Sequence, residues 1–241
     1  MPLLHSILVT THIAVGALAL VLFWVPVMTR KGARTHVNVG RIYLYSMYAV
    51  SVTALIASSM VLYDPIGVQL PDAELEPARA AELSQRFRVF AVFLLMLGIL
   101  VMTSLRHGML ALRERTQAGV LRTAAHRALV VALVIAAIIV GIVGVQYRQI
   151  LLMIFAVVGA AAGIGMWADM RRDMRERSQR VYAHLNSLIG TGIGAYTAFF
   201  AFGGSRFLSE LLPGQWQTIP WIMPAVIGTF AVSRLRRRYG T

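Results

Sequence analysis

Long apolar stretches alternate with short charged segments along the whole of this 241-residue chain. An α-helix needs about 17 to 25 mostly apolar residues to cross the hydrocarbon core of a bilayer. Seven stretches have this length and composition, at residues 4–28, 42–63, 87–105, 128–146, 150–168, 184–203 and 217–233. The pattern therefore predicts an all-α bundle of seven transmembrane helices that forms one membrane domain over residues 1–241.

The composition supports this class. Hydrophobic residues make up 58% of the chain and charged residues only 14%, whereas about 25% of the residues of a soluble domain are charged. The stretch at 217–233 contains Pro224, which transmembrane helices tolerate better than soluble helices do. The chain contains no cysteine, so disulfides, thiolate metal sites and cysteine nucleophiles are excluded.

Basic residues gather in alternate segments between the stretches. Most of the 23 Lys and Arg residues follow the first, third and fifth stretches or lie in the C-terminal tail. Most of the ten acidic residues lie on the other side, chiefly in segment 64–86. The positive-inside rule then predicts an outside N-terminus and a cytoplasmic C-terminus in a bacterial cytoplasmic membrane. We expect the net charge of +13 to meet anionic lipid headgroups rather than nucleic acid.

Glycines recur at a four-residue spacing within two of the stretches, Gly159 with Gly163 and Gly190 with Gly194. Such pairs allow two helix backbones to approach closely. We therefore predict packing seams between helices at both places.

Three histidines follow the basic segments, each at or near the start of an outward-running helix: His36, His126 and His184. They should lie at a similar depth near the cytoplasmic surface. If the second, fourth and sixth helices adjoin, the three imidazoles converge on a metal ion, a haem or an anionic ligand. Their spacing matches no local metal motif, so convergence rests on topology alone. The alternative is ordinary interfacial hydrogen bonding.

One further histidine, His12, lies inside the first apolar stretch. An ionisable side chain within a span is a functional hypothesis by default. His12 either binds a ligand or relays a proton, or it is a neutral imidazole that makes a structural hydrogen bond. The hydroxyls considered for that bond are those of Ser58, Ser59, Tyr196 and Thr197.

The residue inventory excludes several membrane chemistries. The only lysine, Lys31, lies between two stretches, so a retinal Schiff base within the last helix is excluded. The glycine-rich run from Gly190 to Gly194 lies inside a span, which argues against a nucleotide-binding loop. A haem with two axial histidines needs two imidazoles at one depth, and only the cytoplasmic set offers them.

The first quarter of the chain carries a recognisable pattern: Thr11 to Leu20, then Lys31-Gly32, His36, Gly40 to Tyr43 and Met47. It resembles uncharacterised prokaryotic multi-span membrane proteins related to the domain-of-unknown-function 2306 group. Residues 182–202 resemble the end of such proteins more loosely. The resemblance implies a bacterial multi-span protein, singles out His12, Lys31, His36 and Arg41, and implies no particular activity.

Independently of any family, Gly32 and Gly40 permit a tight turn between antiparallel helices. His36 is then predicted to brace that turn.

The leading functional hypothesis is a protein that binds a haem, a metal ion or a quinone-like redox ligand through His36, His126 and His184, with His12 as a separate outer polar point. Two alternatives stay open. One is a structural or assembly subunit that holds membrane-protein partners or a second copy of itself. The other is a transporter of a small neutral solute. The residues leave open whether the protein catalyses a reaction.

Overall fold

The computed structural model describes residues 1–172, 174 and 176–203, together with scattered positions between 223 and 237. This part of the chain is all-α and contains no strand. Its helices are α1 (Pro2–Met28), α2 (Arg34–Tyr63), α3 (Pro65–Gln69), α4 (Pro77–Arg113), η1 (Val120–Arg122), α5 (Ala124–Gln146), α6 (Ile150–Arg171), α7 (Arg177–Ala198) and the π-helical turn η2 (Phe199–Gly203).

Five of these helices, α1, α2, α4, α5 and α6, are long and apolar enough to cross a membrane. They coincide with the first five predicted stretches. The sixth predicted stretch, 184–203, coincides with α7 and η2, but α7 is less apolar because its sequence includes residues such as Asn186, Ser187 and Thr191. The seventh predicted stretch, 217–233, lies largely outside the described residues.

Two helices are longer than their apolar stretches. Helix α2 begins at Arg34 instead of residue 42, and α4 runs from Pro77 to Arg113 instead of 87–105. Hydropathy marks only the part of a helix that lies in hydrocarbon. Arginine and alanine favour helix outside it, and Pro77 occupies the first turn of α4, where its missing N–H and fixed φ are tolerated. Both helices therefore continue beyond the apolar region.

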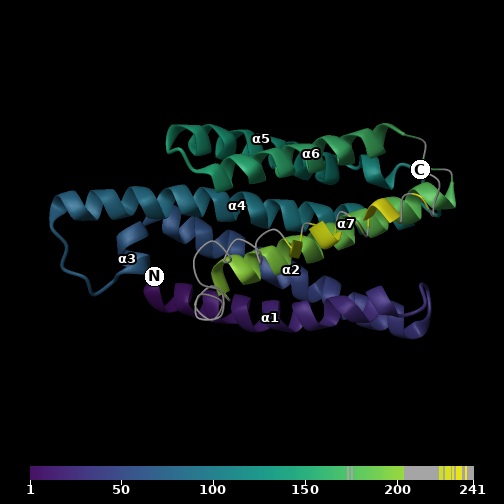
Figure 1. The fold of residues 1–241 in the computed structure, drawn as a ribbon, viewed down its shortest axis with the longest axis horizontal. Helices are drawn as coiled ribbons and strands as arrows, with labels where there is room; N and C mark the ends of the chain where they lie inside the picture. Colours follow the sequence, from purple (N-terminus) through teal and green to yellow (C-terminus); the bar gives the residue numbers. More distant parts are fainter. Residues whose placement is uncertain are drawn as a thin grey trace.

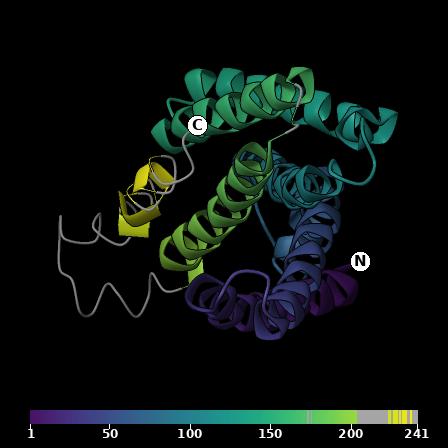
Figure 2. The same cartoon turned by 90° about the vertical axis from the view of Figure 1, so that its right-hand side faces the viewer.

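The central element is α4, which contacts α2, α5, α6 and α7. The α5–α6 pair lies on one side of α4 and the α1–α2 pair on the other (Figure 1). Viewed from the end, α7 crosses diagonally between these two pairs (Figure 2). The turns after α1, α4 and α6 lie at one end of the bundle, opposite the N-terminus (Figure 1). We call this end, with segments 29–33 and 114–123 and residues 172, 174 and 176, the basic end.

Packing between the helices relies on short-range contacts because lipid is as apolar as the side chains themselves. Buried apolar side chains line both sides of α4, with Met96 packed between α5 and α6 and Leu105 towards α1 and α2. Hydrogen bonds join the helices: Ser51 Oγ donates to the Gly98 carbonyl at 2.7 Å. In α1, by contrast, only Ala19 is buried, so most of this helix faces outward.

The predicted glycine seam of α6 is confirmed. A Cβ at Gly159 would lie 3.2 Å from the Cβ of Ala137, and one at Gly163 would lie 2.6 Å from Val134 Cγ2. Because both neighbours belong to α5, these glycines let α5 and α6 pack closely.

The other predicted pair behaves differently. No described residue lies within 4 Å of a Cβ placed at Gly190 or Gly194. Among the described residues, α7 instead makes its close approach on another face, where a side chain at Gly192 would overlap the ring of Phe23 in α1. A Cβ at Gly108 of α4 would likewise overlap Leu188 of α7. Among the described residues, Gly192 is therefore the glycine of α7 that packs closely, rather than Gly190 or Gly194.

Candidate functional site

The turn between α1 and α2 is held by two basic side chains. Lys31 Nζ donates to the carbonyls of Pro26 and Val27, both at 2.7 Å. His36 Nδ1 donates to the same Pro26 carbonyl at 3.0 Å. The last carbonyls of a helix have no partner within it, so His36 and Lys31 cap the end of α1. The bracing role predicted for His36 is confirmed.

Two further features belong to this turn. Gly32 has a φ of +83°, a left-handed conformation that glycine adopts without steric penalty. Desolvation against the end of α1 lowers the pKa of the Lys31 ammonium below its usual value.

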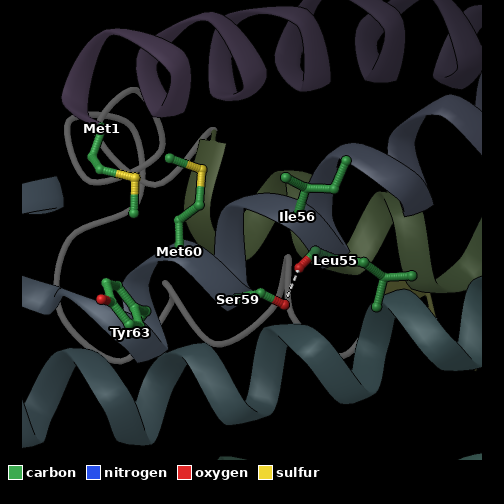
Figure 3. A pocket seen from close by; sticks show the side chains of 6 residues that line it. All are labelled: Met1, Leu55, Ile56, Ser59, Met60 and Tyr63. Atoms are coloured by element: carbon green, nitrogen blue, oxygen red, sulfur yellow. Dashed lines mark hydrogen bonds between the residues drawn. The ribbon is translucent and has the colours of Figure 1, made fainter.

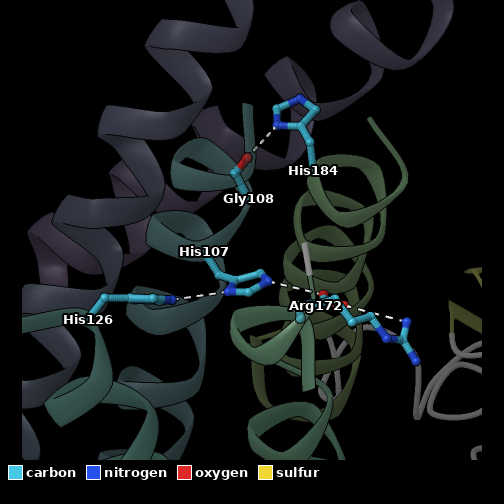
Figure 4. Close-up of polar contacts among 6 residues, drawn as sticks. His107, Gly108, His126, Arg172 and His184 are labelled. Carbon is cyan, nitrogen blue, oxygen red and sulfur yellow. Dashed lines mark hydrogen bonds and ion pairs between the residues drawn. The ribbon is translucent and has the colours of Figure 1, made fainter. Parts of the chain in front are cut away.

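The histidine of α7 is fixed in the same way as His36. His184 Nδ1 lies 3.1 Å from the Gly108 carbonyl of α4, and since a carbonyl only accepts, Nδ1 carries the proton. Figure 4 shows the other ring nitrogen pointing away from Gly108. His36 and Lys31 lie close enough to His184 to interact with it electrostatically. The structure thus brings His36 and His184, from α2 and α7, into one neighbourhood.

The third predicted histidine, His126, lies in a different place. Its side chain is fully buried, and its Nε2 lies 3.0 Å from Nδ1 of His107 in α4. His107 Nε2 in turn lies 3.3 Å from Asp169 Oδ2 in α6. Figure 4 shows the contact between the two histidines. His126 therefore pairs with His107 instead of with His36 and His184.

The histidine–aspartate row runs from the interior to the surface. His126 and His107 are 0% and 1% exposed, whereas Asp169 is 27% exposed and lies 3.9 Å from Arg172, which is 73% exposed. At the inner end, His126 Nδ1 is buried without a hydrogen-bond partner among the described residues, and so is Nε of Arg106. At the outer end of the row Asp169 therefore has a charged partner, whereas at the inner end His126 Nδ1 has no partner among the described residues.

Sequence reasoning missed His107 and Asp169. The third apolar stretch ends at residue 105, which placed His107 in a loop, whereas α4 continues for two more turns and turns His107 inward. One signal was available: His107 and His126 flank the same turn at comparable depth, so a shared position near the basic end followed from topology.

The histidine inside the first helix makes an interhelical contact. His12 Nδ1 donates to the Val50 carbonyl at 3.0 Å and lies 3.1 Å from Thr53 Oγ1. A structural hydrogen bond to a neighbouring helix, one of the two roles expected of His12, is therefore present. The hydroxyl near His12 belongs to Thr53 and not to Ser58, Ser59, Tyr196 or Thr197, the four predicted from the sequence.

Metal coordination can be tested against the grouping of side chains. Among the residues that the structure describes, no group of three His, Asp or Glu side chains is arranged so that it could hold a metal ion. The atoms with coordinating chemistry at the basic end are instead the Nε2 lone pairs of His36 and His184, because the Nδ1 of each is already engaged.

A surface hollow of about 400 Å³ lies at the opposite end, between the start of α1 and the end of α2. Figure 3 shows its lining, which is formed by Met1, Leu55, Ile56, Ser59, Met60 and Tyr63. The Ser59 hydroxyl already donates to the Leu55 carbonyl at 2.8 Å. The hollow is open and mostly apolar, so it has few polar groups that could orient a ligand or take part in a reaction.

Comparisons with known proteins add no relative: no family model matches the chain, and no curated protein or solved structure is similar to it.

Proposed function

We propose that this chain is a seven-span protein of a bacterial cytoplasmic membrane, with its N-terminus outside and its basic end in the cytoplasm. Support comes from the five helices that are long and apolar enough to cross a membrane and from the position of the basic segments at one end of the bundle. The positive-inside rule assigns such an end to the cytoplasm.

We further propose that the protein binds one haem at this end, which Nε2 of His36 and Nε2 of His184 would hold. The supporting observation is the state of the two rings. Each donates its Nδ1–H to a backbone carbonyl, which fixes the tautomer and leaves a lone pair on Nε2. Histidines that bind metals are typically oriented by such a bond from their other nitrogen.

The same ring states favour haem over the other two ligand classes. A quinone offers carbonyl oxygens, which need a donor, whereas a neutral imidazole bound through Nδ1–H offers only an acceptor. A structural metal ion needs about four protein ligands, and the described residues supply no third. Haem iron needs only two axial ligands, because the porphyrin supplies the rest.

The basic end also suits the periphery of a haem. Its propionates are anionic, and segment 30–41 carries Arg30, Lys31, Arg34 and Arg41. A haem held by two histidines would exchange electrons rather than bind a substrate at its iron. The function proposed is therefore one-electron transfer at the cytoplasmic side of the membrane.

The test is an absorption spectrum of the detergent-purified protein, made in cells supplied with a haem precursor. We expect a Soret band whose intensity corresponds to about one haem per chain and whose position shifts on reduction. His36→Ala and His184→Ala should each abolish or strongly change it. His12→Ala is the matched control, since His12 also donates Nδ1–H to a carbonyl but lies near the other end, and its spectrum should match the wild type.

A protein without haem in the spectrum, or a Soret band unchanged in both variants, contradicts the proposal. The capping contacts of His36 and Lys31 would then account for these residues. In that case the structural or assembly role becomes the better interpretation, and co-purifying membrane proteins are the next measurement.

A further inference from the structure

With Asp169 ionised and both imidazoles neutral, the hydrogen-bonded row of Asp169, His107 and His126 has one consistent arrangement of protons. An ionised carboxylate only accepts, so His107 must carry its proton on Nε2, which faces Asp169 Oδ2 at 3.3 Å. His107 Nδ1 is then bare and accepts from Nε2–H of His126 at 3.0 Å. The proton of neutral His126 is thereby placed on Nε2, and its Nδ1 is a bare acceptor.

That bare nitrogen has no partner among the described residues, although it is fully buried. A second buried group also lacks a partner in the described part of the chain, but it is a donor rather than an acceptor: the Nε–H of Arg106. Arg106 lies close enough to His126 to interact with it electrostatically. Buried polar groups almost always find a protein or water partner. A water molecule that accepts a hydrogen bond from Arg106 Nε–H and donates one to His126 Nδ1 would give both groups a partner.

We propose that Asp169, His107 and His126 form a proton-transfer chain, which links the cytoplasmic surface to a buried water site between His126 Nδ1 and Arg106 Nε. The exposure of the three side chains falls from 27% to 1% to 0% along the chain. The three members come from α6, α4 and α5, so the chain forms only when these helices are packed together.

The transfer balances for one proton. The buried water gives a proton to His126 Nδ1 and is left as hydroxide beside the Arg106 guanidinium, while the Nε2 proton of His126 moves to His107 Nδ1. The Nε2 proton of His107 then moves to Asp169, which becomes a neutral acid and releases the proton to water at the surface. Both imidazoles begin and end neutral, with their tautomers exchanged. The reverse sequence carries a proton inward.

The charged groups around the chain are consistent with this direction of exchange. Arg172, which directly follows α6, lies 3.9 Å from Asp169. Arg106 of α4 lies close enough to His126 to place a fixed positive charge beside it. On α5, Arg127 donates to the Arg122 carbonyl, and on η1, Arg122 donates to the Met170 carbonyl. Fixed positive charge near His126 therefore favours passing a proton on over storing it.

The experiment measures hydrogen exchange of the ring N–H of His126 with water. The protein is labelled with ¹⁵N-histidine in detergent and studied by nuclear magnetic resonance, and six histidines give a spectrum that substitutions can assign. In the wild type, the ring proton of His126 should lie on Nε2 and should exchange with water faster than a fully buried N–H without a proton-transfer chain. Asp169→Asn and His107→Gln should slow the exchange by about 100-fold, the usual contribution of a positioned proton-transfer group.

Asp169→Asn also makes a prediction about tautomers. An asparagine amide can donate to His107 Nε2, which moves the His107 proton to Nδ1 and the His126 proton to its own Nδ1. The ¹⁵N shifts distinguish these states. His12→Gln, which leaves the chain intact, is the control and should match wild type.

Exchange of His126 that is already slow in wild type, or that is unchanged in Asp169→Asn, overturns the proposal. If Asp169→Asn fails to fold, Arg172→Gln serves instead. It changes only the charge beside the partly buried Asp169 carboxylate and should change the rate of the exchange, whereas an unchanged rate overturns the proposal. None of these readouts requires haem, so the chain and the haem site can fail separately.

Discussion

The histidines of this protein differ in which ring nitrogen is engaged. His12, His36 and His184 each donate Nδ1–H to a backbone carbonyl, which leaves Nε2 as the acceptor. In His126 the arrangement is reversed, because Nε2 contacts His107 and Nδ1 is bare. The first group is therefore suited to binding an electron-pair acceptor, and His126 to passing a proton. Under the two proposals, one residue type would serve two kinds of chemistry, according to which backbone or side-chain atoms surround it.

A residue-scale prediction concerns the hydroxyl of Tyr43, which is buried and lies 2.9 Å from Thr191 Oγ1. Tyr43→Phe removes one bond between α2 and α7, while Thr191 still donates to the Leu188 carbonyl. Because no donor is orphaned, we expect a loss of about 0.6 kcal/mol in unfolding free energy, the average for such bonds in membranes. Denaturation in detergent measures this. Tyr45→Phe, on the exposed face of the same helix, should change stability by less than about 0.5 kcal/mol.

A second residue-scale prediction uses two glycines that have open space around them. Neither Gly32 nor Gly165 has a described atom within 4 Å of an added Cβ. Gly32 has a left-handed φ of +83°, so Gly32→Ala should destabilise the protein by about 1 kcal/mol. Gly165 lies inside α6, so Gly165→Ala should stabilise it by about 0.5 to 1 kcal/mol. Thermal unfolding in detergent measures both, and shifts of equal sign contradict the backbone argument.

At the scale of elements, the sequence predicted the bounds of some helices well and those of others poorly. Hydropathy located α1, α5 and α6 closely, because their apolar stretches fill nearly the whole helix. It cut α4 short at residue 105 and so hid His107, since an inward-facing histidine at a helix end cannot be told from a loop residue by hydropathy. The proximity of His36 and His184 followed from depth alone, but the partner of His126 depended on which helices adjoin, and no local pattern encodes that.

An element-scale prediction tests the seam between α5 and α6. Gly163→Val places a branched side chain where even a Cβ would lie 2.6 Å from Val134, so the two helices must separate. Overpacking of this kind costs about 1–3 kcal/mol. Gly165→Val lies on the same helix, where an added Cβ meets no described atom within 4 Å, and is the matched control for helix propensity. Detergent unfolding midpoints that fall equally in both variants would exclude the seam as the cause.

At the scale of the whole molecule, three observations agree on one arrangement. The turns after α1, α4 and α6 share one end of the bundle, most of the basic residues lie in segments at that end, and the His36–His184 pair and the Asp169 chain open towards it. A molecule of this kind has its polar side chains gathered at one end, while exposed apolar side chains run along the length of α1. Its orientation therefore decides which compartment the proposed haem and the proposed proton chain would face.

The orientation can be measured directly because the chain has no cysteine, so a single introduced thiol is the only one to react. Ala118 lies exposed at the basic end between α4 and α5, and Ala73 lies exposed in the acidic segment between α3 and α4. A membrane-impermeant maleimide should label Ala73→Cys in intact cells and Ala118→Cys only after permeabilisation, because basic segments are retained in the cytoplasm. Labelling of Ala118→Cys alone in intact cells would invert the molecule and place the proposed haem and proton chain on the outer side. Labelling of both in intact cells would contradict a membrane-spanning α4, since this one helix separates the two positions.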